Sequence, residues 1–325
     1  MIQHMISTTL FLVLATTVSL NLEAADPKPF PFFEYLTGAP TPTMIAYTPS
    51  GLDPRHEPNN ELHPTQSFRA DLEALRPSFD GLVLYGYHPA STPRIMAIAK
   101  ELKFRAVLLG IWQPKSAVEI DGVAQLVQQF QNDFALGVLV GNEGIIFKRY
   151  ETDDLTFAAA RIRTKIPSNV PISTSEPLIG YESEFICNYG DFLAPNIHPA
   201  FDRPDLEAAE AATWARQEAV TLSKRTGKSL LLKETGFPHD GKDIYTVQTQ
   251  AEFWSSYLAP GVLINSRDRA APWIYFGVGF EAFDLPWKSE ASQLPIEKAW
   301  GLFSTERKPY PAMEAWRKAA GRASK

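Results

Sequence analysis

Short apolar segments alternate with amphipathic segments along most of this chain. Near-continuous runs of Val, Leu and Ile are typical of parallel strands that are covered on both faces. The predicted strands are Met44–Tyr47, Gly81–Tyr85, Arg105–Leu109, Leu136–Val140, Val170–Ser173, Phe192–Asn196, Leu230–Lys233 and Trp273–Phe276. A long loop is expected after the first of them, up to about Pro64.

Helical patterns lie between these strands. Ser91-Thr92-Pro93 is a helix start with proline in the first turn, Asp153 and Asp154 suit a helix N-terminus, and Gly227 suits a helix end. The predicted helices are Phe68–Leu75, Ser91–Leu102, Ile120–Phe130, Asp153–Ile166, Asp205–Thr226, Val247–Leu258 and Met313–Ala320. Strands alternating with helices predict an α/β protein, specifically a single (β/α)8 TIM barrel. A doubly wound open sheet is the alternative, but no Gly-rich phosphate loop follows the first strand.

Two glutamates follow predicted strands in similar settings. Leu136–Val140 leads into Gly141-Asn142-Glu143, and Leu230–Lys233 leads into Glu234. A single strand-end glutamate is more often a cap or an ion-pair partner. The C-terminal strand ends of a barrel converge on one face, however, and two carboxylates across a cleft are the minimum equipment for glycoside hydrolysis. Their separation, which distinguishes retaining from inverting chemistry, is not readable from sequence.

Composition narrows the partners. The chain has 325 residues, 45% of them hydrophobic, and a net charge of −6. Because it also lacks a basic run, nucleic acid and anionic membrane surfaces are poor candidate partners. No low-complexity linker divides the chain after Pro42, so residues 43–325 are expected to form one catalytic barrel.

The N-terminus predicts export. Ser7–Leu20 is apolar and uncharged, and Ala24-Ala25 offers small residues for cleavage. Residues 1–25 are therefore interpreted as a signal peptide, with an uncleaved anchor as the alternative, and residues 26–42 as a Pro-rich lead-in. The protein is expected in the periplasm or outside the cell. Cys187 is the single cysteine, so an intrachain disulfide is impossible.

Other chemistries have weaker support in the sequence. His198, His239 and Glu234 could be drawn as a metal site, but no HExxH or comparable spacing exists. Ser173 and Ser175 lack the GxSxG of a nucleophile elbow. We therefore predict no metal and no cofactor.

Four segments together resemble glycoside hydrolase family 17, the β-1,3-glucanase and glucanosyltransferase family within a large clan of retaining barrel enzymes. The resemblance runs from about Ile45 to Pro311. The segments are Val140-Gly141-Asn142-Glu143, Lys233-Glu234-Thr235-Gly236-Phe237-Pro238, Phe280-Glu281-Ala282-Phe283-Asp284-Leu285-Pro286-Trp287-Lys288, and Glu297 with Trp300-Gly301-Leu302-Phe303.

The resemblance implies roles for individual residues. Glu234 would be the nucleophile, Glu143 the acid/base, and Asn142 a partner of the sugar 2-hydroxyl. The further substrate-binding residues that it implies are Tyr47, Tyr85, His198, Phe237, Phe283, Trp287, Lys288 and Glu297. For Tyr47 and Tyr85 core packing is the competing interpretation, and for Lys288 and Glu297 it is an exposed ion pair.

The chain also departs from the family pattern. Phe237 replaces a usual Trp, His198 a usual Tyr, Leu285 a usual Glu, and Val83 a frequent Arg. The catalytic pair is unaffected, so these departures put linkage specificity and subsite number in doubt rather than activity.

The predicted function is that of a retaining enzyme on β-1,3-glucan, either a hydrolase or a transglycosylase, and the chain is expected to be a compact bacterial member of the family. A same-clan enzyme on another β-glycan is one alternative. A non-catalytic glucan-binding envelope protein is the other. No oligomeric state is predicted.

Overall fold

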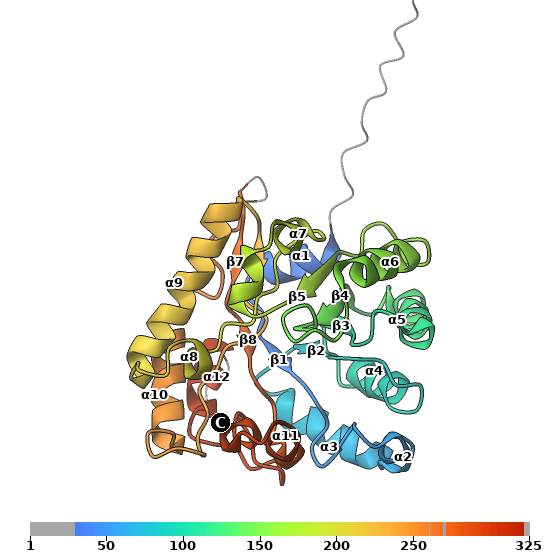
Figure 1. Cartoon of the computed structure of the whole chain (residues 1–325). Coiled ribbons are helices and arrows are strands. Elements are labelled where there is room, and N and C mark those ends of the chain that lie inside the picture. Colours follow the sequence, from blue (N-terminus) through green and yellow to red (C-terminus); the bar gives the residue numbers. More distant parts are fainter. Residues whose placement is uncertain (1–29, 260, 269–270, 322–325) are drawn as a thin grey trace, which may run out of the picture.

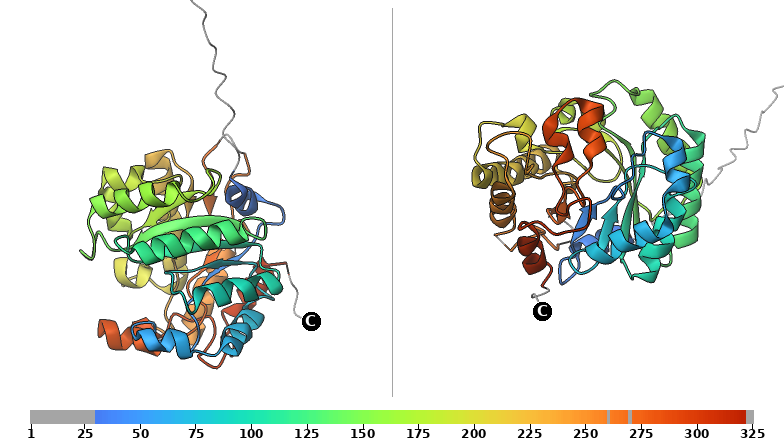
Figure 2. Two further views of the ribbon diagram at one scale, coloured as in Figure 1. Left: turned by 90° about the vertical axis from the view of Figure 1, so that its right-hand side faces the viewer. Right: turned by 90° about the horizontal axis from the view of Figure 1, so that it is seen from below.

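The computed structural model describes residues 30–259, 261–268 and 271–321. The predicted signal peptide, residues 1–25, lies outside this part of the chain. Figure 1 shows the strands at the centre, with α3 to α6 on one side and α9, α10 and α12 on the other. Figure 2 shows from two further directions that the helices form an outer layer.

The elements follow the predicted order. The strands are β1 (Met44–Ala46), β2 (Gly81–Val83), β3 (Ala106–Ile111), β4 (Ala135–Asn142), β5 (Ile172–Ser175), β6 (Leu230–Leu231), β7 (Ile274–Tyr275) and β8 (Val278–Gly279). The α-helices are α1 (Pro31–Thr37), α2 (Glu57–Leu62), α3 (Thr65–Leu75), α4 (Thr92–Glu101), α5 (Ala117–Phe130), α6 (Thr152–Arg163), α7 (Glu184–Asn188), α8 (Pro199–Asp202), α9 (Ala208–Thr226), α10 (Val247–Leu258), α11 (Pro286–Ser292) and α12 (Met313–Ala319). Two 3-10 turns are η1 (Leu178–Glu182) and η2 (Pro295–Lys298).

Parallel pairing closes the strands into a ring. One sheet has the order β5-β4-β3-β2-β1-β8, and β6 pairs with β7. Residues 192–196 fill the gap between β5 and β6: the Asp191 amide donates to the Ile172 carbonyl at 2.7 Å, and the Leu231 amide donates to the Leu193 carbonyl at 2.8 Å. Only two residues separate β7 from β8, so these two segments together form the eighth barrel strand, which pairs with β6 through β7 and with β1 through β8. The predicted (β/α)8 barrel is confirmed, with residues 192–196 as its sixth, irregular strand.

Alternation along the strands separates two apolar regions. Ala106 and Leu108 of β3 face the barrel interior, whereas Val107 and Leu109 pack under the helices. This follows from the two-residue period of a strand, whose successive side chains point to opposite faces. Both faces of the strands are therefore buried from solvent, as the near-continuous apolar runs predicted.

Helix α1 covers the N-terminal end of the barrel. Its Phe32, Tyr35 and Leu36 are buried against interior residues of the strands, and the Tyr35 hydroxyl donates to Asp80 at 2.7 Å, just before β2. Part of the predicted lead-in is therefore packed against the barrel. The other, C-terminal end of the barrel is left for a cleft.

The structure also corrects one loop. The segment expected to be a loop up to Pro64 contains α2, which begins with Glu57 and Pro58 in its first turn. An acid and a proline at these positions favour a helix start, a local signal that the Pro- and Asn-rich composition masked. Within the described ranges, no helix is both long and apolar enough to cross a membrane.

Candidate active site

A cleft of about 880 Å³ opens at the C-terminal ends of the strands. It brings together most of the residues predicted from the sequence. Those that line it are Tyr47, Tyr85, Asn142, Glu143, His198, Glu234, Trp287, Lys288 and Glu297. Phe237 and Phe283 are not among its lining residues.

Glu143 is delivered to the cleft by a tight backbone turn at the end of β4. Gly141 has a φ of 81°, and a Cβ there would lie 2.2 Å from the Tyr150 hydroxyl oxygen, so only glycine fits. Glu143 itself has a φ of 55°, and its amide donates to the Ser175 carbonyl at 2.7 Å. The left-handed turn directs the carboxyl group across the cleft instead of along the strand.

The surroundings of the Glu143 carboxyl group favour its protonated form. Burial raises its pKa above the ordinary value, and the negative charge of Glu234 raises it further. A hydrogen bond from Asn196 Nδ2 to Glu143 Oε1, at 2.8 Å, opposes this shift without reversing it.

The surroundings of the Glu234 carboxyl group favour its ionised form. It is only 4% exposed, and burial alone would raise its pKa. The adjacent Lys233 ammonium, with which it is ion-paired, and His198 Nε2, 3.1 Å from Oε2, hold the pKa at about 2 instead. Glu234 is therefore ionised over the whole physiological range, as a nucleophile must be.

Asn142 links the two carboxyl groups. Its Oδ1 accepts hydrogen bonds from Lys233 Nζ and, at 3.3 Å, from Asn196 Nδ2. An ammonium group can only donate, so the oxygen of the Asn142 amide is the atom that faces Lys233. This leaves Asn142 Nδ2 free of the bonds made by Oδ1; its role as a partner of the sugar 2-hydroxyl stays a prediction.

Three functional residues were missed from the sequence. Lys233 is 1% exposed and lies over the Tyr85 ring at 4.8 Å, although strand alternation would send it away from Glu234. Asn196 positions Glu143. Glu281 is buried and pairs with Lys288 at 2.6 Å, and burial raises its pKa to about 7. Glu281 lies in the same family-like segment as Lys288, and that shared segment was a usable signal.

The aromatic side chains divide between cleft and core. Phe237 is 3% exposed and stacks on Phe253, with ring centroids 5.5 Å apart, under α10. The expectation that Phe237 binds substrate is therefore corrected. Phe283 is fully buried and packs edge-on against Tyr47. Trp287 lines the cleft, with the Arg55 guanidinium 5.6 Å from its ring centroid.

The tyrosines have mixed roles. Tyr47 contributes to the cleft wall, but its hydroxyl donates to Asp71 at 2.9 Å. Its position therefore fits the core interpretation as much as the substrate interpretation. Burial raises the pKa of Tyr85 well above its ordinary value, and the nearby Glu234 charge adds to this. Tyr85 is thus a neutral hydroxyl beside the Glu234 carboxylate.

The residues of the rejected alternatives have other partners. His239 Nε2 lies 2.9 Å from Asp284 Oδ1, so His239 does not join His198 at Glu234. The Ser173 hydroxyl donates to the Phe192 carbonyl, and the Ser175 hydroxyl donates to Asn196 Oδ1 at 3.0 Å. Both serines therefore hold neighbouring strands together.

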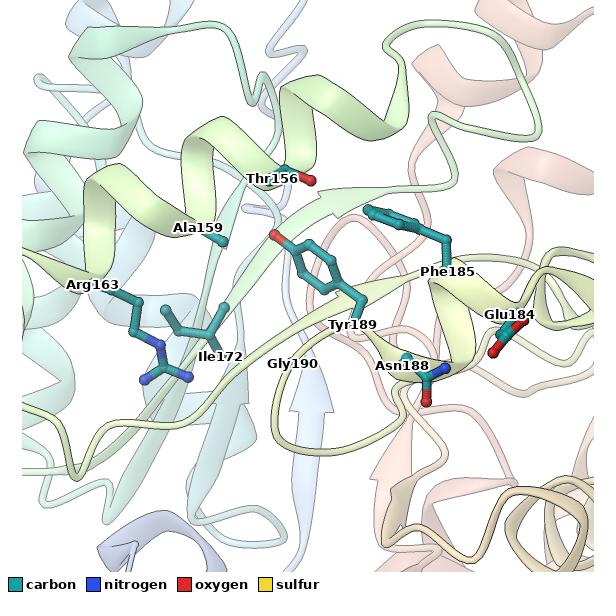
Figure 3. Close-up of a pocket in the computed structure, with 9 residues that line it drawn as sticks. All are labelled: Thr156, Ala159, Arg163, Ile172, Glu184, Phe185, Asn188, Tyr189 and Gly190. Carbon is teal, nitrogen blue, oxygen red and sulfur yellow. The ribbon is translucent and has the colours of Figure 1, made fainter.

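A second hollow, of about 560 Å³, lies between α6 and α7 (Figure 3). Two of its polar side chains bond within the protein: Arg163 pairs with Asp191, and the Tyr189 hydroxyl donates to the Leu155 carbonyl at 2.8 Å. Its residues are separate from those of the strand-end cleft, and we assign it no ligand.

A barrel with one carboxyl group of raised pKa and one carboxylate of low pKa on a shared cleft is typical of barrel glycoside hydrolases. The profile of the BtgE/BtgC glycoside hydrolase domain matches residues 45–301. The chain belongs to this family, and its resemblance to family 17 is confirmed; the expected bacterial origin stays a prediction.

Relatives agree with this assignment. The chain is 26% identical over 315 residues to the probable glucan endo-1,3-beta-glucosidase btgC of Aspergillus clavatus, an alignment covering 86% of this chain and 42% of the relative. It is 24% identical over 251 residues to the probable family 17 glucosidase SCW10 of Saccharomyces cerevisiae, covering 74% of this chain and 61% of the relative. The chain thus aligns with less than half the length of the Aspergillus protein.

Solved structures share the fold. A family 17 beta-1,3-glucanosyltransferase from Rhizomucor miehei superposes with a TM-score of 0.62 at 17% identity, covering 85% of this chain and 97% of that one. An endo-laminarinase from Formosa superposes with a TM-score of 0.65 at 18% identity, covering 86% and 88%. At this identity the likeness supports the barrel alone.

Proposed function

We propose that this protein is a retaining glycoside hydrolase or transglycosylase that acts on β-1,3-glucan. The observation that carries the proposal is the opposite tuning of two carboxyl groups on one cleft. The pKa of Glu143 is raised, so it keeps its proton to a higher pH than an ordinary glutamate, and Glu234 has a pKa of about 2. Separated pKa values of this kind assign the acid and the nucleophile.

The chemistry follows from these assignments. Glu143 gives its proton to the glycosidic oxygen as the C1–O bond breaks, and a Glu234 oxygen forms a bond to C1. Water or a second sugar then attacks C1, the bond to Glu234 breaks, and Glu143 takes the proton of the incoming hydroxyl. Asn142 Nδ2 holds the 2-hydroxyl of the reacting sugar, and no cofactor is required.

The β-1,3 linkage of the proposed substrate is inferred from the names of relatives. The names of the btgC and SCW10 proteins and of the Rhizomucor structure point to β-1,3-glucan or to family 17 chemistry. The proposed partner is therefore a β-glucan oligosaccharide or polysaccharide. An exported, periplasmic or secreted location accords with such a substrate and with the predicted signal peptide.

The test is mass spectrometry of the protein incubated with linear β-1,3-gluco-oligosaccharides. Shorter products indicate hydrolysis, and products longer than the input indicate transfer. Glu234→Gln removes the nucleophile and is expected to lower turnover about 10⁴-fold or more. Glu143→Ala is expected to lower it about 10²–10⁴-fold.

Two outcomes would overturn the proposal. Turnover that survives both substitutions would show that the carboxyl groups are misassigned. Failure of the wild-type protein to change these oligosaccharides would overturn the assignment to β-1,3-glucan. The protein would then be tested on β-1,4-glucan and β-1,4-mannan. Cleavage there identifies the same-clan alternative, and binding without cleavage identifies the glucan-binding alternative.

A further inference from the structure

Two exposed segments of the chain meet at one end of the cleft. One is the loop after β1, which carries Arg55, and the other is α11, which has no buried residue. The Arg55 guanidinium pairs with Glu290 of α11 at 3.2 Å and lies over the Trp287 ring, 5.6 Å from its centroid. Arg55 and Trp287 both line the cleft. We call Arg55, Trp287 and Glu290 the clasp.

The two sides of the clasp are anchored separately. On the β1 side, Arg55 Nε donates to Asp53 at 2.9 Å, and Asn59 Nδ2 donates to the Asp53 carbonyl at 3.1 Å. On the α11 side, Lys288 pairs with the buried Glu281 at 2.6 Å. An exposed ion pair between two free segments would be weak. Because each segment is already fixed by its own contacts, the clasp is in place before a substrate binds.

The clasp lies across the barrel from the proposed acid/base. In the strand order β5-β4-β3-β2-β1-β8, the loops after β1 and β8 are at the far end from β4, which Glu143 follows. Figure 1 shows α11 near α3, on the side of the strands away from β4 and β5. The acid/base must reach the oxygen of the leaving group, so the leaving part of the glucan lies toward Glu143. The glycone, which is the part that becomes bound to Glu234, therefore extends toward the clasp.

The cleft is small for a polysaccharide. Its volume of about 880 Å³ lies within the range of about 300–1,000 Å³ that encloses a drug-sized ligand. Such a space holds a few sugar units, whereas an internal segment of a polysaccharide needs a groove that is open at both ends. Contact between Arg55 and α11 joins the two walls where the glycone would leave the cleft.

Unpaired donors line the same part of the cleft. Trp287 Nε1 and His88 Nε2, in the loop after β2, are buried and have no hydrogen-bond partner among the residues that the structure describes. His88 Nδ1 accepts from the Ala90 amide at 3.1 Å, so in the neutral ring the proton is on Nε2. A buried donor is costly until a ligand supplies an acceptor. The non-reducing end of a β-1,3-glucan offers one, because its 3-hydroxyl is free where an internal sugar carries the next unit.

Resting on the proposed function, we propose that the clasp closes the glycone end of the cleft, so that the enzyme cleaves β-1,3-glucan near its non-reducing end. The terminal sugar lies at the clasp and accepts hydrogen bonds from Trp287 and His88. A longer glycone meets the contact between Arg55 and α11 and binds only where that contact opens. The number of sugars between the clasp and Glu234 therefore sets which bond is cut.

The test maps the cut bond in laminariheptaose that carries heavy oxygen at its reducing end. The labelled product is the leaving group of the first step, so its length, measured by mass spectrometry, identifies the bond whether water or a sugar attacks afterwards. Arg55→Ala removes the centre of the clasp. Glu290→Lys places a like charge beside Arg55, and the Glu290 side chain is 71% exposed, so the change leaves the core intact.

The matched control is Arg161→Ala on α6. Arg161 pairs with Asp121 at 2.8 Å, its side chain is 33% exposed against 34% for Arg55, and it is outside the cleft lining. We expect the wild-type protein to release mainly long labelled products. Both clasp variants should raise the share of shorter labelled products about threefold, as the loss of one or two contacts of an exposed arginine implies. Arg161→Ala should keep the wild-type pattern.

Three results would overturn the inference and leave the proposed function standing. They are wild-type cuts spread evenly over the inner bonds, short labelled products as the main wild-type release, and clasp variants whose pattern equals that of Arg161→Ala. A wild-type protein that cleaves no β-1,3-gluco-oligosaccharide overturns the proposed function and the inference together.

Discussion

His198 Nε2 lies 3.1 Å from Oε2 of Glu234, in a buried site where each residue favours the charged form of the other. Burial lowers the pKa of His198, but the hydrogen bond and charge of Glu234 raise it above the ordinary value of 6.5. The family pattern places a tyrosine here, which would donate a hydrogen bond at any physiological pH. Because histidine can lose its charge near neutral pH, the stabilisation of the Glu234 carboxylate depends on pH.

This pair should stabilise the fold most between about pH 4.5 and 6.5. The contribution of His198, whose pKa is raised on folding, is complete below 6.5 and is lost as the pH rises through its folded pKa. The contribution of Glu234 is complete above its ordinary 4.5 and is lost as the pH falls through about 2. We expect His198→Gln to lower Tm by on the order of a few degrees within this window and by less outside it. Calorimetry over roughly pH 3 to 9, a range that covers most of the titration of both groups, checks this prediction. A Tm difference that stays constant with pH would contradict it.

The Lys233 ammonium should set the acid limb of the pH–rate profile. Lys233 lies between Glu234 and Asn142 and is the largest influence that lowers the pKa of Glu234 against its burial. Lys233→Met should therefore move the acid limb of kcat/KM upward from about pH 2 and lower kcat by about 10–100-fold.

The control for this prediction is Lys298→Met, which removes a surface lysine paired with Asp240 at 2.8 Å. It should leave the profile unchanged. An acid limb that does not move in Lys233→Met would mean that His198 alone keeps Glu234 ionised.

Gly141→Ala should damage both stability and activity. A Cβ at Gly141 would clash with the Tyr150 hydroxyl at 2.2 Å, and the backbone is left-handed at φ 81°. The two effects together should cost about 2–5 kcal/mol of unfolding free energy. Displacing Glu143 should lower kcat on the order of 10²-fold.

Gly51→Ala separates strain from clash. Gly51 has a φ of 70° with nothing within 4 Å of its would-be Cβ, so only the backbone cost of about 1–2 kcal/mol applies. Chemical denaturation measures both variants. Equal losses of stability would show that the turn at Gly141 can move Tyr150 aside.

Glu176→Gln should change how stability depends on pH. Burial raises the pKa of Glu176 from 4.5 to about 7. An acid with a raised pKa in the folded state holds its proton longer than in the unfolded state, so its contribution to stability falls as the pH rises from 4.5 to 7. Glutamine cannot ionise, and the Tm of the variant should rise relative to wild type over this interval.

The same variant tests the positioning role of Glu176. It accepts hydrogen bonds from the backbone amides of Ile145 and Ile146, in the loop that follows Glu143, and glutamine keeps one acceptor oxygen. We expect kcat to fall about tenfold, because these two bonds hold the loop that directly follows Glu143. An unchanged kcat would show that the one remaining acceptor oxygen is enough to hold this loop.

Much of the barrel was readable from the chain because its signals are local. The apolar runs at Leu136–Val140 and Leu230–Lys233 arise from burial on both faces, and a glutamate follows each of them closely. A strand that is buried on both faces has a run of apolar residues, whichever segments lie beside it. The proposed catalytic pair, Glu143 and Glu234, was therefore predictable from the local pattern, and the barrel brings both residues to one cleft.

The surroundings of that pair were not readable, because they depend on contacts between distant segments. Lys233 reaches Asn142 across 91 positions, and Asn196 reaches Glu143 across 53, whereas the resemblance to the family had indicated only His198 as a partner of Glu234. Phe237 was misassigned for a related reason: its motif gives its residue type, whereas the direction of its side chain depends on how the segment after β6 packs under α10. Local pattern determined which residues are buried and where the strands end. Only the closed barrel decided which side chains meet, since each strand's rotation is set by packing against all the others.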